Sequence, residues 1–335
     1  MRKLVRKGEV SLERTIDHAP VEAKVVPLKE PSRLWYRRND LEIPSDYLGS
    51  AEETYIKLKN SPLYDATDDI WLSHMDEKDV VDDRVISTHA QLLDVLALQV
   101  LGKQEEAHAK FERLLNDEEY NFKRSLWDWH PEKGTERKGC HMLVGDQLLG
   151  LVCQSFYTNR PFIIDNVRSM RGRGAFYKWD MKLWKYSYRK DGSDLYSSDE
   201  KKTTYNQMLG VLLLERAGLM EEASDQYHRL QSTKLFDEHL RQWNYSRHEG
   251  MTNASKHSSV FLLDVIVNSV LGHHQSAIQR HDFALRSGVY DEKKGLWCWN
   301  SDGWKEEPSR FRFASDQLLG VIAKKYLEKG GKDES

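Results

Sequence analysis

Cysteine is scarce in this chain, with three residues in 335. Cys140, Cys153 and Cys298 form no CxxC pair, and an odd number cannot make a complete set of disulfides. Such usage is typical of proteins from a reducing compartment, where thiols stay reduced. We therefore expect a cytoplasmic protein without a disulfide framework.

Long apolar runs and an excess of charge are also missing. No stretch approaches the roughly 18 apolar residues of a membrane-spanning helix. The basic residues 1–7 are not followed by the apolar segment of a secretory signal. A formal net charge of -3 gives no reason to expect nucleic acid or an anionic membrane as the main partner. We expect neither a nucleic acid nor a membrane as partner.

The common local motifs of catalysis are absent. The sequence contains no P-loop, GxGxxG, HExxH or GxSxG motif. We therefore expect no cofactor and no metal. One alternative stays open, because Cys140, His141 and Cys298 have the side chains that ligate zinc.

What the chain does contain is a repeat of two aromatic residues seven positions apart. The second residue of each pair is Trp, and successive Trp residues are 56, 57, 59 and 54 positions apart. Polar, turn-forming residues separate the two aromatics, so each pair predicts a short β-hairpin. The five pairs are Tyr64/Trp71, Tyr120/Trp127, Tyr177/Trp184, Phe236/Trp243 and Tyr290/Trp297.

Each Trp precedes a helix that is apolar on nearly all sides, which predicts a buried helix. In three copies a glycine follows at the expected helix end (Gly102, Gly218 and Gly272). An amphipathic helix comes next, as the spacing of Ala107, Phe111 and Leu114 indicates. The apolar helices are marked near their starts by Gln91, Gln147, Gln207, Phe261 and Gln317.

The two ends of the repeat region complement each other. The first repeat helix, around Tyr55, is amphipathic and lacks an apolar partner, whereas the last helix, from Gln317, is apolar and lacks an amphipathic one. We therefore predict an all-α domain over 46–330, an α/α toroid of about five helical hairpins closed by pairing of the N- and C-terminal helices, with short β-hairpin loops. Residues 1–45 are expected to form an extended arm and 331–335 a flexible tail. An open tetratricopeptide-type solenoid is the alternative, although its period is about 34 residues.

This layout resembles the α/α-toroid superfamily, which includes sugar epimerases, glycosidases, polysaccharide lyases, protein prenyltransferases and lanthionine cyclases. The resemblance covers about residues 46–328 and rests on the repeat. It implies a functional site where the loops that precede the inner helices converge. Most members have six or seven hairpins, so a count of five departs from the family.

Carboxylates recur near the starts of the apolar helices. One position carries Asp146, Asn206 and Asp316, and the position four residues later carries Asp94 and Asp264 in the other two copies. Residues four apart share a helix face, which we expect to look into the central cavity. Asp146, Asp316, Asp94 and Asp264 are thus candidate acids or bases, because glycoside hydrolysis requires two carboxylates. The alternative is structural, with Asp146, Asn206 and Asp316 as helix N-caps and Asp94 and Asp264 interacting with the helix dipole.

Histidines and aromatics complete the candidate site. His89, His141 and His257 lie shortly before the helix-start positions and are candidate general acids or bases. The repeated Trp residues are expected mainly to pack between hairpins. The candidates for substrate binding are Trp129, Trp299, Trp304, Tyr205, Asn206 and Arg312.

The function expected from the resemblance and the polar positions is that of a carbohydrate-active enzyme, of the glycoside hydrolase or sugar epimerase type. It would act on a small-molecule or oligosaccharide ligand in a central cavity. One alternative is a non-catalytic toroid that binds a glycan, small ligand or protein partner through its aromatic loops. Another is an isoprenoid- or peptide-modifying enzyme with zinc. The sequence predicts neither the substrate nor the oligomeric state.

Overall fold

The computed structural model describes residues 49–76, 78–81, 86–116, 120–121, 126–127, 141–172, 176–189, 202–238, 242–248, 251–253, 256–301 and 311–330. The chain divides into two units, Met1–Glu42 and Ile43–Ser335. All described residues belong to the second unit. The expected arm and C-terminal tail therefore lie outside the described residues, as do Trp129, Cys140 and Trp304.

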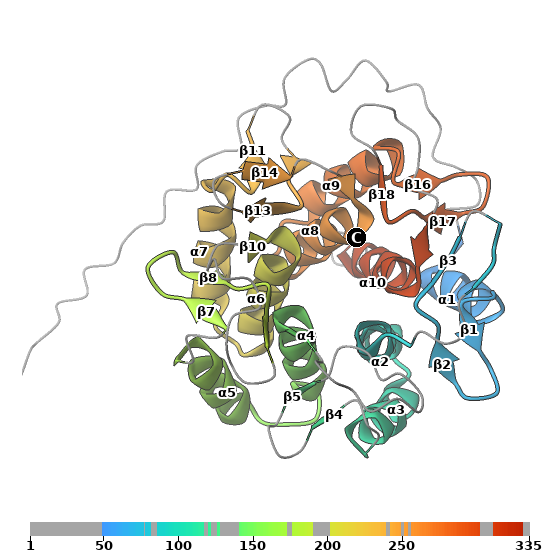
Figure 1. The fold of residues 1–335 in the computed structure, drawn as a ribbon, viewed down its shortest axis with the longest axis horizontal. Coiled ribbons are helices and arrows are strands. Elements are labelled where there is room, and N and C mark those ends of the chain that lie inside the picture. Colours follow the sequence, from blue (N-terminus) through green and yellow to red (C-terminus); the bar gives the residue numbers. More distant parts are fainter. Residues whose placement is uncertain are drawn as a thin grey trace, which may run out of the picture. The chain divides into compact units, whose positions relative to one another are not determined.

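Among the described residues, alternate helices along the chain form an inner layer (Figure 1). Buried side chains occupy almost every position of their first three turns, because other helices surround them. None of the described helices has the length and hydropathy required to cross a bilayer. The inner helices are α2 (Thr88–Leu101), α4 (Val144–Gln154), α6 (Thr204–Arg216), α8 (Ser258–Val270) and α10 (Ala314–Gly330).

An outer layer of amphipathic helices surrounds the inner one (Figure 1). Each outer helix buries one face, as α3 does with Ala107, Lys110, Phe111 and Leu114. The predicted spacing of apolar residues is thus confirmed. The outer helices are α1 (Ala51–Lys59), α3 (Gln104–Asn116), α5 (Arg160–Gly172), α7 (Met220–Gln231) and α9 (His274–Arg286).

The inner helices pack in sequence order, α2 on α4, α4 on α6, α6 on α8 and α8 on α10. The last of them, α10, also packs against α2 and against the outer helix α1. The predicted all-α fold of the toroid type is confirmed. Its closure by the terminal helices stays a prediction, which the contacts of α10 with α1 and α2 favour.

Short β-hairpins join each outer helix to the next inner helix. In every hairpin the two aromatics spaced by seven residues are direct cross-strand partners, as with Tyr64 and Trp71. The predicted hairpins are therefore confirmed. Their strands are β1 (Tyr64–Asp65) with β2 (Ile70–Trp71), β4 (Tyr120–Asn121) with β5 (Leu126–Trp127), β7 (Tyr177–Lys178) with β8 (Leu183–Trp184), β11 (Phe236–Asp237) with β12 (Gln242–Trp243), and β16 (Tyr290–Asp291) with β17 (Leu296–Trp297).

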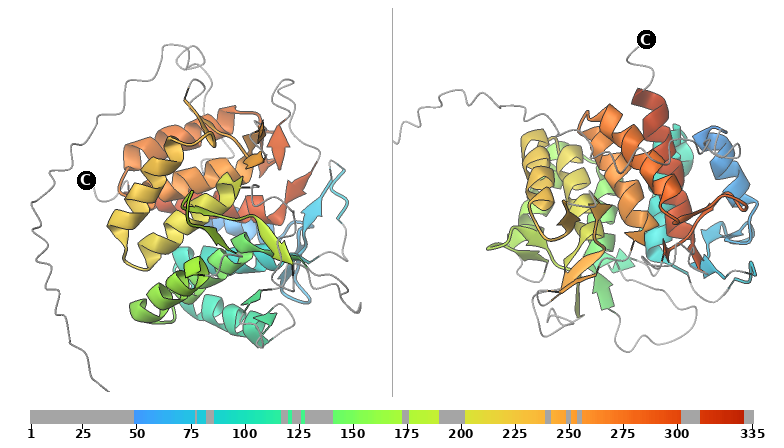
Figure 2. Two further views of the ribbon diagram at one scale, coloured as in Figure 1. Left: turned by 60° about the vertical axis from the view of Figure 1, so that its left-hand side comes forward. Right: turned by 90° about the horizontal axis from the view of Figure 1, so that it is seen from above.

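A second set of strands links neighbouring repeats. A strand that leads into an inner helix pairs with the strand that follows the hairpin of the next repeat, and β19, which leads into α10, pairs with β3 of the first repeat. Figure 2 shows the strands gathered toward one end of the helices. The pairs are β6 (His141–Leu143) with β9 (Ser187–Arg189), β10 (Lys202–Thr203) with β13 (Ser246–His248), β15 (Lys256–His257) with β18 (Asn300–Ser301), and β19 (Arg312–Phe313) with β3 (His74–Met75), while β14 (Met251–Asn253) pairs with β13.

The repeated glutamine ties each inner helix to the Trp of its own hairpin. Gln147 accepts a hydrogen bond from the Trp127 backbone N–H at 2.8 Å and donates one to the Trp127 carbonyl at 2.7 Å. The same pair of bonds joins Gln91 to Trp71, Gln207 to Trp184 and Gln317 to Trp297. A buried backbone N–H and C=O are thus both satisfied, which explains why glutamine recurs.

The glycines that follow three residues later make room for the indoles. A Cβ atom at Gly150 would lie 2.0 Å from Nε1 of Trp127, and one at Gly210 would lie 2.1 Å from Nε1 of Trp184. Gly320 is related in the same way to Trp297, at 2.2 Å. The Trp rings therefore lie against the helix backbone, and the repeated Trp residues have an architectural role.

Candidate functional site

Three side chains from three inner helices meet at the N-terminal ends of those helices. His89 is the second residue of α2, Asp146 the third of α4 and Tyr205 the second of α6. Nδ1 of His89 lies 2.6 Å from Oδ1 of Asp146, and Nε2 of His89 is hydrogen-bonded to the Tyr205 hydroxyl. Each of the three was a candidate site residue from the sequence, but their contact with one another was not predicted.

The two contacts of His89 fix the orientation of its ring. A carboxylate oxygen accepts a hydrogen bond, so Nδ1 donates to Asp146 and Nε2 accepts from the Tyr205 hydroxyl. The side chain of Asp146 is fully buried, whereas that of His89 is 15 % exposed. Solvent therefore reaches the histidine but not the carboxylate that orients it.

The pKa of Tyr205 indicates which other ionisable groups lie nearby. Burial raises the pKa of its phenol well above the usual value, and Asp146, Asp316 and Tyr245 raise it further. The hydroxyl therefore stays protonated near neutral pH. These effects place Asp316, from α10, and Tyr245, which follows β12, within electrostatic range of the three-residue cluster.

Asp316 is the counterpart of Asp146, since it is the third residue of α10. It is 1 % exposed, and burial raises its pKa to about 8, although a hydrogen bond with Ser258 lowers it. Oδ2 of Asp316 has no hydrogen-bond partner among the described residues, and neither has Oδ2 of Asp146. The site thus combines a protonated carboxyl at neutral pH with a histidine-bound one, and such divergent environments assign acid and base roles in enzymes.

His257 lies at the start of α8, beside these groups. It is 3 % exposed, and burial lowers its pKa to about 4, so the imidazole is neutral. Its ring stacks on that of Tyr245 with centroids 3.8 Å apart. A neutral histidine at this place can accept or donate a hydrogen bond without carrying charge.

The alternative interpretation of Asp146 and Asn206 as helix N-caps is wrong. Helix α4 has Leu143 at its N-cap, without a side-chain cap, and Asp146 lies inside the first turn. In α6 the cap is Thr203, whose hydroxyl accepts from the backbone N–H of Asn206. The Asn206 amide donates to the carbonyl of Lys185 at 2.7 Å, so this residue holds the chain after β8.

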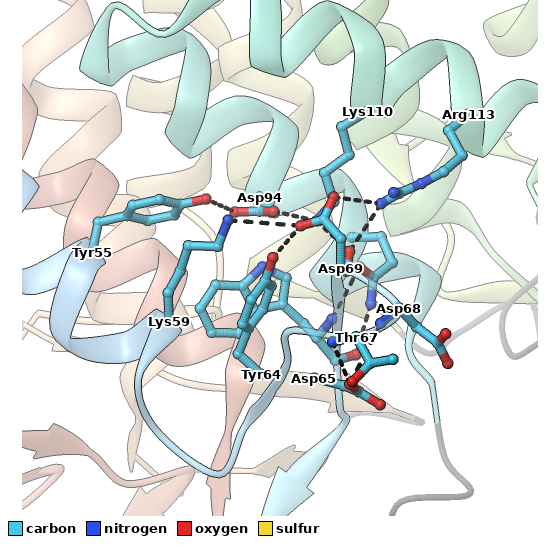
Figure 3. Close-up of polar contacts among 12 residues, drawn as sticks. Tyr55, Lys59, Tyr64, Asp65, Thr67, Asp68, Asp69, Asp94, Lys110 and Arg113 are labelled. Atoms are coloured by element: carbon cyan, nitrogen blue, oxygen red, sulfur yellow. Dashed lines mark hydrogen bonds and ion pairs between the residues drawn. The ribbon is translucent and has the colours of Figure 1, made fainter.

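Asp94 does not join the cluster. Its Oδ1 accepts from the Tyr55 hydroxyl of α1 at 2.7 Å, and its Oδ2 lies 2.5 Å from Nζ of Lys110 in α3 (Figure 3). Lys110 and Arg113 also reach Asp69 in the first hairpin. This carboxylate therefore faces the outer helices, and the expectation that it looks into a central cavity is wrong.

Asp264 repeats this arrangement in the fourth repeat. Its Oδ1 accepts from the Tyr227 hydroxyl at 2.7 Å, and its Oδ2 lies 3.2 Å from Nε of Arg280 in α9. Asn268 donates to Oδ1 at 3.1 Å. Both carboxylates are paired charges that join the two helix layers, so neither enters the candidate site.

The other candidates have mixed outcomes. Arg312 is buried and pairs with Asp291 at 2.7 Å, which holds β19 to the last hairpin. Trp299 is 37 % exposed and lies next to His257, with ring centroids 5.3 Å apart. His141 lies in β6, but its side chain is outside the described residues.

The zinc alternative is not tested, because Cys140 and the His141 side chain lie outside the described residues. Cys298 is buried, and burial raises the pKa of its thiol to about 11. Within the described part of the chain, no group of three or more His, Cys, Asp and Glu residues is placed to hold a metal ion.

Sequence reasoning missed Ser258 and Tyr245. Ser258 lowers the pKa of Asp316, and Tyr245 stacks on His257. Tyr245 did carry a signal, since it is the aromatic two residues after the repeated Trp243. Ser258 carried no sequence signal of this kind, apart from its position next to His257.

Comparisons with known proteins bear on the fold. No protein-family model and no curated protein matches the sequence. A sugar epimerase from a ruminal bacterium has a TM-score of 0.53 at 10% identity, covering 84% of this chain and 99% of that one. Cellobiose 2-epimerase from Bacillus thermoamylovorans has a TM-score of 0.52 at 11% identity, covering 83% of this chain and 99% of that one. A D-mannose isomerase has a TM-score of 0.54 at 9% identity, covering 86% of this chain and 100% of that one. At these identities the similarity establishes the fold, and the chain shares the α/α-toroid architecture of these sugar-processing enzymes.

Proposed function

We propose that this protein is an enzyme that transfers a proton on a sugar, as an aldose epimerase or an aldose–ketose isomerase. The observation that carries the proposal is the His89 ring, held between Asp146 and Tyr205 at the N-terminal ends of three inner helices. A histidine oriented by a buried carboxylate is a suitable general base near neutral pH.

In this mechanism His89 removes the proton from C2 of the open-chain aldose. Its Nε2 is the free position of the ring once the Tyr205 hydroxyl gives way to substrate, and Asp146 stabilises the imidazolium that forms. The electron pair of the C–H bond moves into an enediolate. Return of a proton to the other face of C2 gives the epimer, whereas delivery to C1 gives the ketose.

Asp316 is the candidate for the returning proton. Its carboxyl is protonated through neutral pH, because burial raises its pKa to about 8. The positive ends of the inner helix dipoles also lie at this end of the fold, and they favour the negative charge of the enediolate. Both Asp146 and Asp316 raise the pKa of Tyr205, which supports placing the two carboxyls at one reaction centre.

The names of the structural neighbours agree with this chemistry. Three of them, with TM-scores of 0.52 to 0.54, are a sugar epimerase, a cellobiose 2-epimerase and a D-mannose isomerase. This agreement is analogy at the level of the fold. The proposal itself rests on the arrangement of His89, Asp146, Tyr205 and Asp316.

Glycoside hydrolysis is the second candidate, and the pair Asp146 and Asp316 favours it. A family 8 glycosyl hydrolase from Klebsiella pneumoniae also shares the fold, with a TM-score of 0.50 at 10% identity. In that reaction one carboxyl protonates the leaving group and the other acts as base or nucleophile. The bond from Asp146 to His89 makes Asp146 less available for this role, so we rank hydrolysis second.

The test is deuterium incorporation from D₂O at C2 of aldoses, followed by NMR across a panel of hexoses and disaccharides. We expect exchange with the wild-type protein and a loss of about 10²- to 10⁴-fold in His89→Gln. His228→Gln, on the exposed side of α7, is the matched control and should keep wild-type activity. Exchange that survives in His89→Gln would exclude this base, and release of reducing ends without exchange would indicate the hydrolase instead.

A further inference from the structure

A continuous row of aromatic rings leads away from the proposed reaction centre. Successive ring centroids are 3.8, 5.3, 5.5, 5.1 and 5.6 Å apart. We call this set the aromatic row. Its members, in spatial order, are Tyr245, His257, Trp299, Phe313, His74 and Phe311.

The two ends of the row differ in accessibility. At the inner end, Tyr245 contributes to the electrostatic environment of Tyr205 in the reaction centre. Toward the outer end, Trp299 is 37 % and Phe311 43 % exposed. Trp299 and Phe311 belong to one contiguous set of rings, and contiguous exposed apolar surface, unlike a singly exposed residue, is typical of binding sites.

The exposed rings are held in place by the backbone around them. Trp299 donates from its backbone N–H to the Phe311 carbonyl at 3.0 Å and accepts at its own carbonyl from the Ser258 N–H at 3.3 Å. The rings of His257 and Phe313 lie against the Trp299 ring. A rigid aromatic surface loses little conformational entropy when a ligand binds to it.

The uncharged, aromatic character of the row indicates which class of ligand it would bind. No Asp, Glu, Lys or Arg belongs to it, and the neighbouring Arg312 is already paired with Asp291. Among the described residues, the rings of the row supply no charge of their own to a charged ligand, and their flat faces suit the apolar C–H faces of neutral sugar rings.

We propose that the aromatic row binds the sugar units of a neutral oligosaccharide beyond the unit that reacts at His89. This inference rests on the proposed function for the place of the reacting unit. Since that unit must open to an aldehyde, it is the reducing end, and the rest of the oligosaccharide extends outward over Trp299 toward Phe311. The substrate class is therefore a neutral oligosaccharide of two or more units.

The experiment measures binding by isothermal titration calorimetry in the His89→Gln background. The ligands are glucose, mannose and their β-1,4-linked oligomers of two and three units. The test variants are Trp299→Ala and Phe311→Ala. Trp179→Ala is the control, because Trp179 is an exposed indole (59 %) in the third hairpin and does not belong to the row. Circular dichroism confirms that each variant is folded.

We expect affinity to rise about tenfold or more from one unit to two, and Trp299→Ala to remove this gain while leaving monosaccharide affinity unchanged. Phe311→Ala should lower the affinity for the three-unit ligands most. Trp179→Ala should leave the affinity for every ligand unchanged. Equal affinity for one and two units, no binding of the three-unit ligands, or equal loss in Trp299→Ala and Trp179→Ala would each overturn the proposal. Binding without deuterium exchange in the wild-type protein would retain this inference and remove the proposed proton transfer.

Discussion

The hydroxyl of Tyr227 donates to Oδ1 of Asp264 at 2.7 Å, and the hydroxyl of Tyr55 makes the same bond to Asp94. In both repeats a basic residue of the next outer helix binds the second oxygen. The other repeats have no tyrosine at this outer position. They carry Phe111, Val167 or His281 there, and their inner helices carry glycine in place of the aspartate.

The two arrangements are alternative ways to fill one space between the helix layers. Tyrosine, aspartate and a cation form a buried polar group in which each charge is paired. Glycine leaves room for the indole, as at Gly150 against Trp127. The residues vary together because a buried aspartate without both partners would be costly.

Removal of one member of a buried triad should therefore destabilise the protein strongly. We expect Lys110→Met to lower the free energy of unfolding by about 3–5 kcal/mol, since the buried Asp94 carboxylate would lose its cation. The double variant Lys110→Met with Asp94→Asn should recover part of the loss. Urea denaturation measures both, and equal stability of wild type and Lys110→Met would show that the ion pair contributes nothing.

Closing the space beside an indole should also be costly. Gly210→Ala places a methyl group where the Trp184 ring lies, at 2.1 Å in the present geometry. We expect a loss of about 1–3 kcal/mol in unfolding free energy. Gly172→Ala, whose Cβ meets nothing within 4 Å, is the control and should be neutral or stabilising. Thermal denaturation of the two variants gives the comparison, and similar melting temperatures would contradict the prediction.

The glutamine that binds the Trp backbone offers a third test. Gln147→Leu removes the two buried hydrogen bonds that Gln147 makes with the Trp127 N–H and C=O, and we expect a loss of about 1–3 kcal/mol per bond in unfolding free energy. Gln275→Leu makes the same chemical change at an exposed site of α9 and should have little effect. Amide hydrogen exchange at Trp127 should accelerate only in Gln147→Leu. Unchanged protection there would mean that the hairpin does not depend on this bond.

Asp316 should give stability a distinct pH dependence. Its pKa is raised to about 8 in the folded protein, so the folded state binds more protons than the unfolded state between about pH 4 and pH 8. Its contribution to stability is therefore present at low pH and falls as pH rises through this window, by up to about 1.4 kcal/mol per pH unit. The Asp316→Asn variant should lack this part of the fall in stability with rising pH.

The pH dependence of activity should also depend on the ionisation of Asp316. If Asp316 returns the proton, kcat/KM should decline above about pH 8 as the carboxyl ionises. Stability and activity profiles of wild type and Asp316→Asn, measured between pH 4 and pH 9, check both statements. Parallel stability curves for the two proteins would show that this carboxyl is not perturbed in the fold.

The repeat made the fold predictable. Aromatics seven residues apart are cross-strand partners because a short hairpin imposes that spacing, and helices apolar on all sides belong to the inner layer. Both features are local, so the sequence expresses them directly. His89 and Asp146 were identifiable one by one for the same reason, since each lies near the start of an inner helix.

The contacts of the site were not predictable in this way. The pairing of His89 with Asp146 and Tyr205 depends on how three helices approach one another. The direction of Asp94 was misjudged because a helix buried on all sides has no single polar face. Its surroundings are set by Tyr55 and Lys110, which belong to other helices.

The contact between α1 and α10 has a consequence for how the chain acquires its structure. The backbone N–H of Ala51 donates to Glu328 across 277 positions of sequence. During synthesis α1 leaves the ribosome long before α10 exists, so the face of α1 that packs on α10 has no final neighbour until the last helix has been made. Contacts of such sequence separation form late and slowly. A chaperone that shields this face during translation would therefore have more effect on the yield of folded protein than on its final stability.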